Sequence, residues 1–180
     1  MTDHFALLGE ARRPFLDPEK LKEKYHARSR EAQPDAELNE AFRVLSDPKL
    51  RLHHLLLLEG ADLPAGRAVP PAVAELFWET GNVLRETDGW LQRNAAASSN
   101  LARAMLHPAR TKLERKLADL EEQLHAKHTT ALAELQRLDA AWQATAPNDL
   151  PQLVQLYDTL AYLTRLLERT AEKRLQLQLV

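Results

Sequence analysis

The chain has 180 residues, of which 44% are hydrophobic and 28% charged, and its formal net charge at pH 7 is -2. This length and apolar content permit a buried core, in one domain or in two small ones. The small net charge gives no overall attraction to nucleic acids or membranes, so we expect neither as a partner. The chain has no cysteine, which excludes disulfides, thiolate metal ligands and cysteine catalysis, and which suits a reducing, cytoplasmic location.

Leucine and alanine dominate the sequence and aromatic residues make up only 6% of it, which favours helices throughout. The longest wholly apolar run, at 55–58, is far too short to cross a bilayer. The N-terminus carries Asp3 and His4 and lacks the apolar run of a secretory signal. We therefore expect an all-helical protein without a membrane segment.

The first predicted element of note is a basic helix over residues 18–32. Asp17 is a candidate N-cap, and Pro18 suits the first helical position because its missing N–H has no partner there. This helix is the one local surface basic enough to attract an acidic partner. The alternative is a solvated face whose charges are balanced by its own glutamates at i to i+4 spacing. Its lysines and arginines include Lys22, Arg28 and Arg30.

A corner between two helices is predicted at Gln33-Pro34-Asp35. Pro34 disfavours helical geometry at Gln33, and Asp35 can cap a new helix that Pro48 ends. Short apolar helices that stop at glycine precede and follow this helix pair. The N-terminal part of the chain is thus predicted to be a helical hairpin with short flanking helices.

The stretch 61–70 is rich in helix breakers and has no hydrophobic periodicity. We therefore predict that it links a unit at 1–60 to a second unit at 71–180. Breakers that separate two periodic segments are typical of a boundary between domains. The linker is therefore the expected site of first attack by proteases.

Three helices are predicted in the second unit. The first spans 72–87 and ends near Gly89, and an Ala/Ser/Asn stretch at 94–100 is a loop or a frayed turn. The second helix has Pro108 in its first turn and continues along a leucine stripe, and the third begins at Leu150. Long helices joined by a short loop pack antiparallel, so we expect a three-helix antiparallel bundle.

Three large apolar residues, Leu76, Phe77 and Trp78, are consecutive on the first helix of this bundle. Three neighbours span about 200° of a helix, so they cannot all enter one core stripe. With Leu76 in the core, we expect Trp78 to stay exposed. Tyr162 is similarly offset from the leucines around it on the last helix. If the two helices lie side by side, these rings form one aromatic patch.

A series of motifs runs in unbroken order through the first 60 residues: Phe5-Ala6-Leu7-Leu8-Gly9, Arg12-Arg13-Pro14-Phe15, Leu21, Tyr25, Pro34-Asp35, Asn39 to Pro48, and Arg51 to Gly60. This series resembles the J-type co-chaperones of the HscB class. Members of that class deliver an iron-sulfur scaffold protein to a DnaK-type chaperone. The resemblance implies a J-like hairpin unit and a three-helix bundle in an L-shaped, two-domain arrangement, and it implies both proteins as partners.

The resemblance also implies two binding surfaces. The one for the chaperone comprises Lys22, Arg28, Arg30, Gln33, Pro34 and Asp35, and the one for the scaffold comprises Leu76, Phe77, Trp78, Glu79 and Tyr162. The sequence departs from the family at the corner, where Gln33 replaces the histidine that is tied to stimulation of the chaperone's ATPase. The hairpin is also shortened before Asn39. We therefore expect weak stimulation or none, and the alternative function is a structural adaptor that holds another protein.

Two Glu-x-x-His spacings, Glu23/His26 and Glu122/His125, have the pattern of ferritin-like di-iron helices. A metal oxidase is therefore the enzyme hypothesis to weigh. The second pair lies off the leucine stripe, however, and the two pairs fall on opposite sides of the predicted linker. We therefore expect structural or solvated roles for these residues, with no catalytic residues, no metal site and no cofactor.

Overall fold

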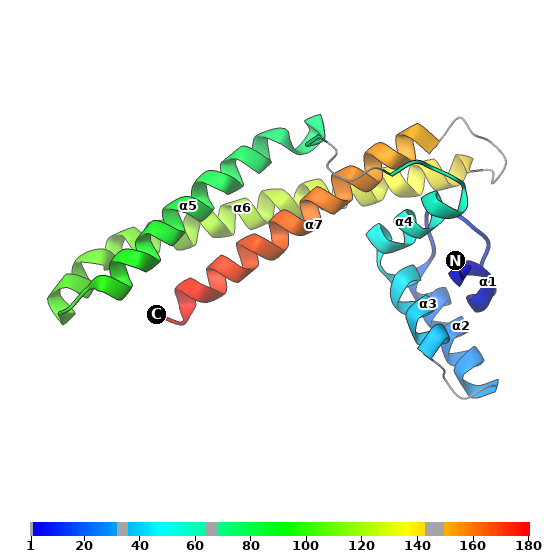
Figure 1. Cartoon of the computed structure of the whole chain (residues 1–180), viewed down its shortest axis with the longest axis horizontal. Coiled ribbons are helices and arrows are strands. Elements are labelled where there is room, and N and C mark those ends of the chain that lie inside the picture. The colour runs from blue at the N-terminus through cyan, green and yellow to red at the C-terminus, as the bar shows by residue number, and fades with distance from the viewer. Residues whose placement is uncertain (1, 32–35, 64–67, 143–149) are drawn as a thin grey trace. The chain divides into compact units, whose positions relative to one another are not determined.

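The computed structural model describes residues 2–31, 36–63, 68–142 and 150–180. All regular elements within these ranges are helical, as predicted from the composition (Figure 1). The predicted corner at Gln33-Pro34-Asp35 lies outside the described residues. The elements are α1 (His4–Leu8), α2 (Pro18–Glu31), α3 (Ala36–Ser46), α4 (Pro48–Leu58), a 3-10 turn η1 (Pro71–Val73), α5 (Ala74–Ala96), α6 (Asn100–Ala141) and α7 (Leu150–Gln178).

The chain forms two compact units, each built from two segments. Unit 1 comprises residues 1–67 and 131–158, and unit 2 comprises 68–130 and 159–180. The helices α6 and α7 therefore contribute to both units. The division into domains at 61–70 stays a prediction that proteolysis can test.

In unit 1, aspartates begin the helices and glycine ends the first of them. Asp3 accepts hydrogen bonds from the backbone N–H groups of Phe5 and Ala6, and Asp47 accepts one from Leu50 N–H at 2.9 Å. The predicted cap at Asp17 is confirmed, because its Oδ1 accepts the first N–H groups of α2. Gly9 ends α1 with a φ of 66°, a conformation that favours glycine.

A buried arginine ties three segments of unit 1 together. Arg51 is 3% exposed; its Nε donates to Pro14 O at 2.9 Å and its Nη1 donates to Leu45 O at 2.7 Å. Burial lowers the pKa of Arg51 to about 10, so the guanidinium remains charged at neutral pH. Phe5 and leucines of α1, α2, α3 and α4 complete the core: Phe5, Leu8, Leu21, Leu45, Leu52, Leu55 and Leu56.

The segment 131–158 closes unit 1 against the loop that precedes α2. Trp142 donates from Nε1 to the carbonyl oxygen of Arg12 at 2.9 Å. On α7, the ring of Tyr157 stacks on His53 of α4 with 5.3 Å between ring centroids. Because these contacts join residues about a hundred positions apart, nothing in the local sequence pattern predicted them.

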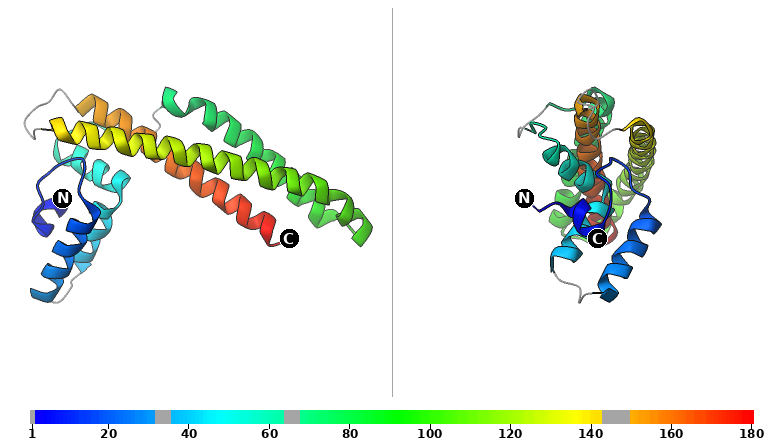
Figure 2. Two further views of the ribbon diagram at one scale, coloured as in Figure 1. Left: turned by 180° about the vertical axis from the view of Figure 1, so that it is seen from behind. Right: turned by 90° about the vertical axis from the view of Figure 1, so that its right-hand side faces the viewer.

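In unit 2, α5, α6 and α7 run side by side as a bundle (Figure 2). A Lys116–Glu86 ion pair of 2.5 Å joins α6 to α5, and a Lys173–Asp88 pair of 2.6 Å joins α7 to α5. Leucines predicted from the periodicity fill the interior, which confirms the three-helix bundle: Leu76, Leu84, Leu113, Leu117, Leu120, Leu124, Leu160 and Leu163 are all buried.

The predicted end of the first bundle helix is wrong. Helix α5 does not stop near Gly89 but continues to Ala96. The cause is a tertiary contact, since Trp90 is 2% exposed and its Nε1 donates to Leu106 O on α6 at 3.0 Å. Burial of this large ring outweighs the cost of about 1 kcal/mol for a glycine inside a helix.

The predicted start of the second bundle helix is also wrong. Helix α6 begins at Asn100, so Pro108 lies inside it rather than in its first turn. Ser99 provides the cap, because its Oγ accepts the backbone N–H of Ala102 at 3.1 Å. The predicted loop at 94–100 therefore shrinks to the short break 97–99 between the two helices.

Candidate partner-binding surfaces

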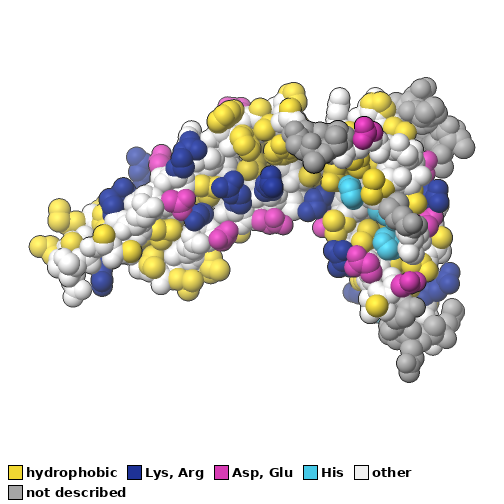
Figure 3. Space-filling model, viewed as in Figure 1, with side chains coloured by type: hydrophobic (Ala, Val, Ile, Leu, Met, Phe, Trp, Pro, Cys, Tyr) yellow, Lys and Arg dark blue, Asp and Glu magenta, His cyan; other side chains and the backbone are white. Residues whose placement is uncertain are grey.

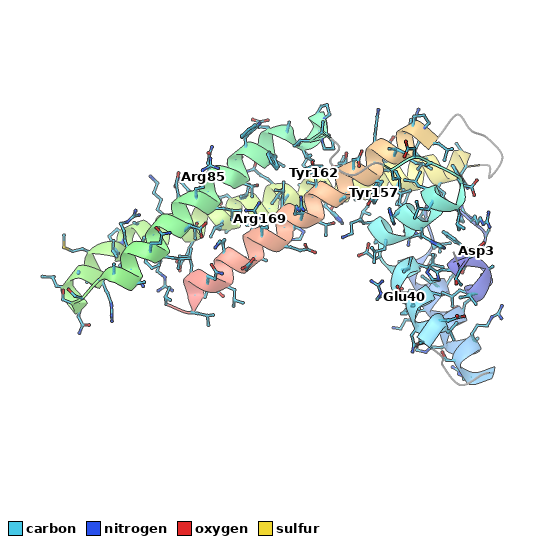
Figure 4. The ribbon with its side chains drawn as sticks, in the orientation of Figure 1. Asp3, Glu40, Arg85, Tyr157, Tyr162 and Arg169 are labelled. Carbon is cyan, nitrogen blue, oxygen red and sulfur yellow. The ribbon has the colours of Figure 1, made fainter. Side chains whose placement is uncertain are left out.

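The first surface is the aromatic patch, which we define as Phe77 and Trp78 of α5 with Tyr162 of α7. The rings of Phe77 and Tyr162 meet edge to face, with 6.2 Å between centroids and an interplanar angle of 77°. Phe77 and Trp78 meet edge to face in the same way at 5.6 Å. The condition set for the patch, that the two helices lie side by side at these rings, is therefore met within unit 2. Figure 4 labels Tyr162 on α7.

Exposure differs sharply among the three consecutive residues of α5. Leu76 is 6% exposed and Trp78 is 68% exposed, while Phe77 is half-buried. The prediction that Trp78 is the residue left outside the core is thus confirmed. Tyr162 is half-buried and Glu79 is exposed beside the patch. A large exposed ring that packs on a half-buried ring, as Trp78 packs on Phe77, is the kind of anchor that protein interfaces use.

Exposed arginines lie along the same two helices, and the sequence analysis missed them. Arg85 of α5 and Arg169 of α7, both labelled in Figure 4, are exposed, as is Arg165. Figure 3 shows basic side chains at the surface along the bundle. The sequence does contain a signal for this arrangement. Arg85 lies seven residues after Trp78, and Arg169 lies seven residues after Tyr162. Seven residues are about two helical turns, so each arginine lies on the same helix face as the ring before it. The aromatic patch therefore has a cationic flank that suits an acidic contact on a partner.

The second surface is the exposed side of α2 in unit 1. Lys22, Arg28 and Arg30 are all exposed. Among the side chains that the structure describes, none of the three forms an ion pair, whereas Lys24 is held by Glu10 and by the carbonyl oxygen of Gly9, each at 3.0 Å. These three cations are therefore available to an acidic partner. Gln33, Pro34 and Asp35, which were predicted to belong to this surface, lie outside the described residues.

The two Glu-x-x-His pairs do not form a metal centre. Glu23, His26, Glu122 and His125 are all exposed. Within the described ranges, no group of three or more histidines and carboxylates could hold a metal ion. The same ranges contain no helix with the length and hydropathy needed to cross a membrane.

The fold defines a class of all-helical proteins in which a short N-terminal helical unit precedes a bundle of three longer helices. The HscB structure from Vibrio cholerae superposes with a TM-score of 0.63 at 17% identity and covers 98% of this chain and 99% of its own. Human co-chaperone HscB superposes with a TM-score of 0.50 at 16% identity, over 96% of this chain and 82% of its own. At such identities these structures show the fold alone.

Sequence comparison shows the particular family. The HscB co-chaperone homologue of Bordetella pertussis is 31% identical over 137 aligned positions, which cover 66% of this chain and 78% of the relative. The homologue of Bordetella bronchiseptica matches to the same extent. No family model matches the chain. The chain belongs to the HscB co-chaperone family, and the resemblance drawn from its motifs is confirmed.

Proposed function

We propose that this protein is a co-chaperone of iron-sulfur cluster assembly that binds a scaffold protein through the aromatic patch. The observation that carries the proposal is the edge-to-face contact of Phe77 with Tyr162, which presents the exposed ring of Trp78 on a surface shared by two helices. Leu76 anchors this surface from the core, and Glu79 and the flanking arginines surround it with charge. The cluster is the partner's cargo, since a chain without cysteine has no thiolate ligands for it.

The proposed role is binding, with no enzymatic step and no cofactor of its own. The location that fits it is the cytoplasm. A DnaK-type chaperone is the second proposed partner, through Lys22, Arg28 and Arg30 together with the Gln33-Pro34-Asp35 corner. We expect this second contact to stimulate the chaperone's ATPase weakly or not at all, because Gln33 replaces the histidine of the family motif.

The second candidate function is an adaptor that keeps the family scaffold and holds another protein without chaperone work. The altered corner favours this adaptor function, because a J-like unit without the motif histidine lacks the residue that is tied to stimulation of the chaperone's ATPase. Affinity purification of the tagged protein from its own organism, probed for the scaffold protein and for DnaK-type chaperones, separates the two. Recovery of the scaffold supports the co-chaperone role. Its absence, with another protein recovered in stoichiometric amount, overturns that role in favour of the adaptor.

A further inference from the structure

A groove between α5 and α6 in unit 2 has basic walls. Its volume is about 270 Å³, and both helices contribute basic residues together with small or apolar ones. Glu86, the acidic residue among those that line the groove, pairs with Lys116 at 2.5 Å, so its charge is already balanced. The other lining residues are Arg85, Gly89 and Arg93 of α5 and Ala109, Lys112 and Leu113 of α6.

The three cations of the groove have no acidic partner among the residues that the structure describes. Arg93 and Lys112 are exposed and form no ion pair with a described side chain. Arg85 donates from Nη2 to Asn82, which is a neutral amide. The surrounding sequence offers no acid either, because 89–113 contains no Asp or Glu although the chain as a whole has a net charge of -2. The groove therefore attracts an anionic group from outside the chain.

Gly89 leaves open the space that the groove occupies. This glycine lies inside α5, where alanine would favour the helix more. A Cβ atom at this position would meet Arg93 Nη1 at 3.5 Å, which is an ordinary contact distance, so close packing does not require the glycine. The helical backbone of α5 does not require it either. What the missing side chain provides is room between the two basic walls.

Two exposed apolar side chains extend this surface along α6. Leu101 is 74% exposed and Met105 is 76% exposed. Met105 lies seven residues before Lys112 and Leu101 lies eleven before it, which are about two and three helical turns, so all three share one face of α6 about 17 Å long. Figure 3 shows hydrophobic side chains at the surface of the end of the bundle where α5 meets α6. This face thus presents apolar side chains at one end and cations at the other.

The combination favours a protein segment over other anionic ligands. A membrane surface is flat and cannot enter a groove between two helices. Nucleic acid would bring phosphates to the cations, but its bases are bound by stacking on aromatic rings, which Leu101 and Met105 do not offer. A peptide can provide both carboxylates for Arg93 and Lys112 and apolar side chains for the two exposed residues, as in recognition of an amphipathic helix by a groove.

We infer that this groove binds an acidic segment of a protein partner, whose carboxylates pair with Arg93 and Lys112 and whose apolar side chains cover Leu101 and Met105. The groove shares Arg85 with the cationic flank of the aromatic patch, but its other lining residues are separate from that patch. The inference therefore holds whether or not the aromatic patch binds a scaffold protein.

Fluorescence anisotropy of the full chain with a defined peptide tests this inference. The probe is a labelled peptide of repeated Glu-Glu-Leu, about 12 residues and so about 18 Å long as a helix, and the comparison peptide is repeated Gln-Gln-Leu. Wild type should bind the acidic probe with a dissociation constant on the order of 10 μM at low salt, and the glutamine peptide about tenfold more weakly or less tightly still. Failure to bind the acidic probe overturns the inference, as does equal affinity for the glutamine peptide or for a single-stranded oligonucleotide.

Three charge-removing variants test the location of the site. Arg93→Gln and Lys112→Gln should each weaken binding of the acidic probe about tenfold, as the loss of one charge-assisted hydrogen bond requires. The matched control is Arg103→Gln, which removes the same charge from the same acid-free stretch. Arg103 lies nine residues before Lys112, hence on the opposite face of α6, so this variant should bind as wild type does. Equal losses for all three variants would indicate a general charge effect and overturn the assignment to the groove.

The variant Gly89→Ala separates binding from stability. It should raise the melting temperature by about 2–4 °C because alanine favours the helix, yet weaken binding of the acidic probe roughly fivefold because its methyl group takes up space in the groove. The control is Gly81→Ala, since Gly81 does not line the groove and a Cβ atom there would meet Arg85 Nη1 at 3.4 Å. This control should gain stability without losing affinity. A Gly89→Ala variant that binds the probe as tightly as the control overturns the inferred site.

Discussion

Arg13 and Asp139, which lie 126 positions apart, form a two-pronged ion pair within unit 1. Arg13 donates from Nε to Asp139 Oδ1 at 3.0 Å and from Nη2 to the other carboxylate oxygen. The same Oδ1 also accepts the backbone N–H of Phe15 at 3.0 Å. Asp139 is 6% exposed, so one buried carboxylate fastens the loop before α2 to the end of α6.

Loss of this carboxylate should therefore destabilise unit 1. We expect Asp139→Ala to lower the free energy of unfolding by about 2 kcal/mol, mainly because the Phe15 N–H loses its acceptor and a cavity forms. The Arg13 side chain is half-exposed, so its share of the loss is reduced by solvent screening. Urea unfolding measures the effect. The control is Arg137→Ala, which removes only a surface ion pair with Glu134 and should leave the urea midpoint nearly unchanged. If the two variants lower the midpoint equally, Asp139 does not have this role.

The buried side chain of His54 in unit 1 should make the protein less stable in mild acid. His54 is 5% exposed, and its Nε2 accepts the backbone N–H of His4 at 3.1 Å, which requires the neutral ring. Burial, with a contribution from His4, lowers the pKa of His54 below 6.5. The unfolded chain therefore binds the proton more readily. The stability due to neutral His54 is complete above pH 6.5 and is lost as the pH falls from there through the lowered pKa.

The matched variant for this prediction is His54→Gln, whose side-chain oxygen can accept the same hydrogen bond without titrating. Urea midpoints measured between about pH 7 and pH 5 should fall more steeply for wild type than for the variant. Parallel pH profiles would show that His54 contributes no pH dependence.

The predicted linker should be the first site of protease attack. Residues 61–70 are rich in helix breakers, whereas 113–142 lies in the packed helix α6 up to Ala141. Brief digestion with a protease of broad specificity, followed by mass spectrometry, should place the first cuts near 60–71. First cuts within 113–142 would show that the predicted boundary is wrong.

The altered corner should impair chaperone activation. We expect the wild-type chain to stimulate a DnaK-type ATPase weakly or not at all in a single-turnover assay. Gln33→His alone should restore little, because only Ala36, Glu37 and Leu38 separate Asp35 from Asn39 and one side chain does not rebuild a shortened hairpin. Strong stimulation by wild type, or full rescue by the single substitution, would instead indicate an ordinary co-chaperone.

Local patterns predicted much of the fold. The leucine stripe placed Leu117, Leu120 and Leu124 in the core, and the spacing of three apolar neighbours identified Trp78 as exposed. The missed features depend on contacts between distant segments. Gly89 looked like a helix end because the burial of Trp90 against α6 cannot be read from its own sequence neighbours. Ser99 is of a residue type that caps helices, whereas the predicted start rested on Pro108 alone.

Part of the candidate surfaces, like much of the fold, was predicted from the sequence. The rings of Phe77, Trp78 and Tyr162 followed from helical angles, and the family resemblance placed them in one site. The arginine flank was missed because Arg85 and Arg169 lie on two different helices, which the sequence alone does not place side by side. Their roles in binding stay predictions, as do those of Lys22, Arg28 and Arg30.

The most direct test of the account is calorimetric titration of the scaffold protein with a Trp78→Ala, Tyr162→Ala double variant. If the aromatic patch is the binding surface, affinity should fall at least 30-fold per ring, as about 2 kcal/mol or more for each anchor requires. The melting temperature should stay within a few degrees of wild type, whereas the core control Leu76→Ala should lower it clearly. Unchanged affinity, or a melting temperature that falls as far as that of the control, would contradict the assignment of these rings to partner binding.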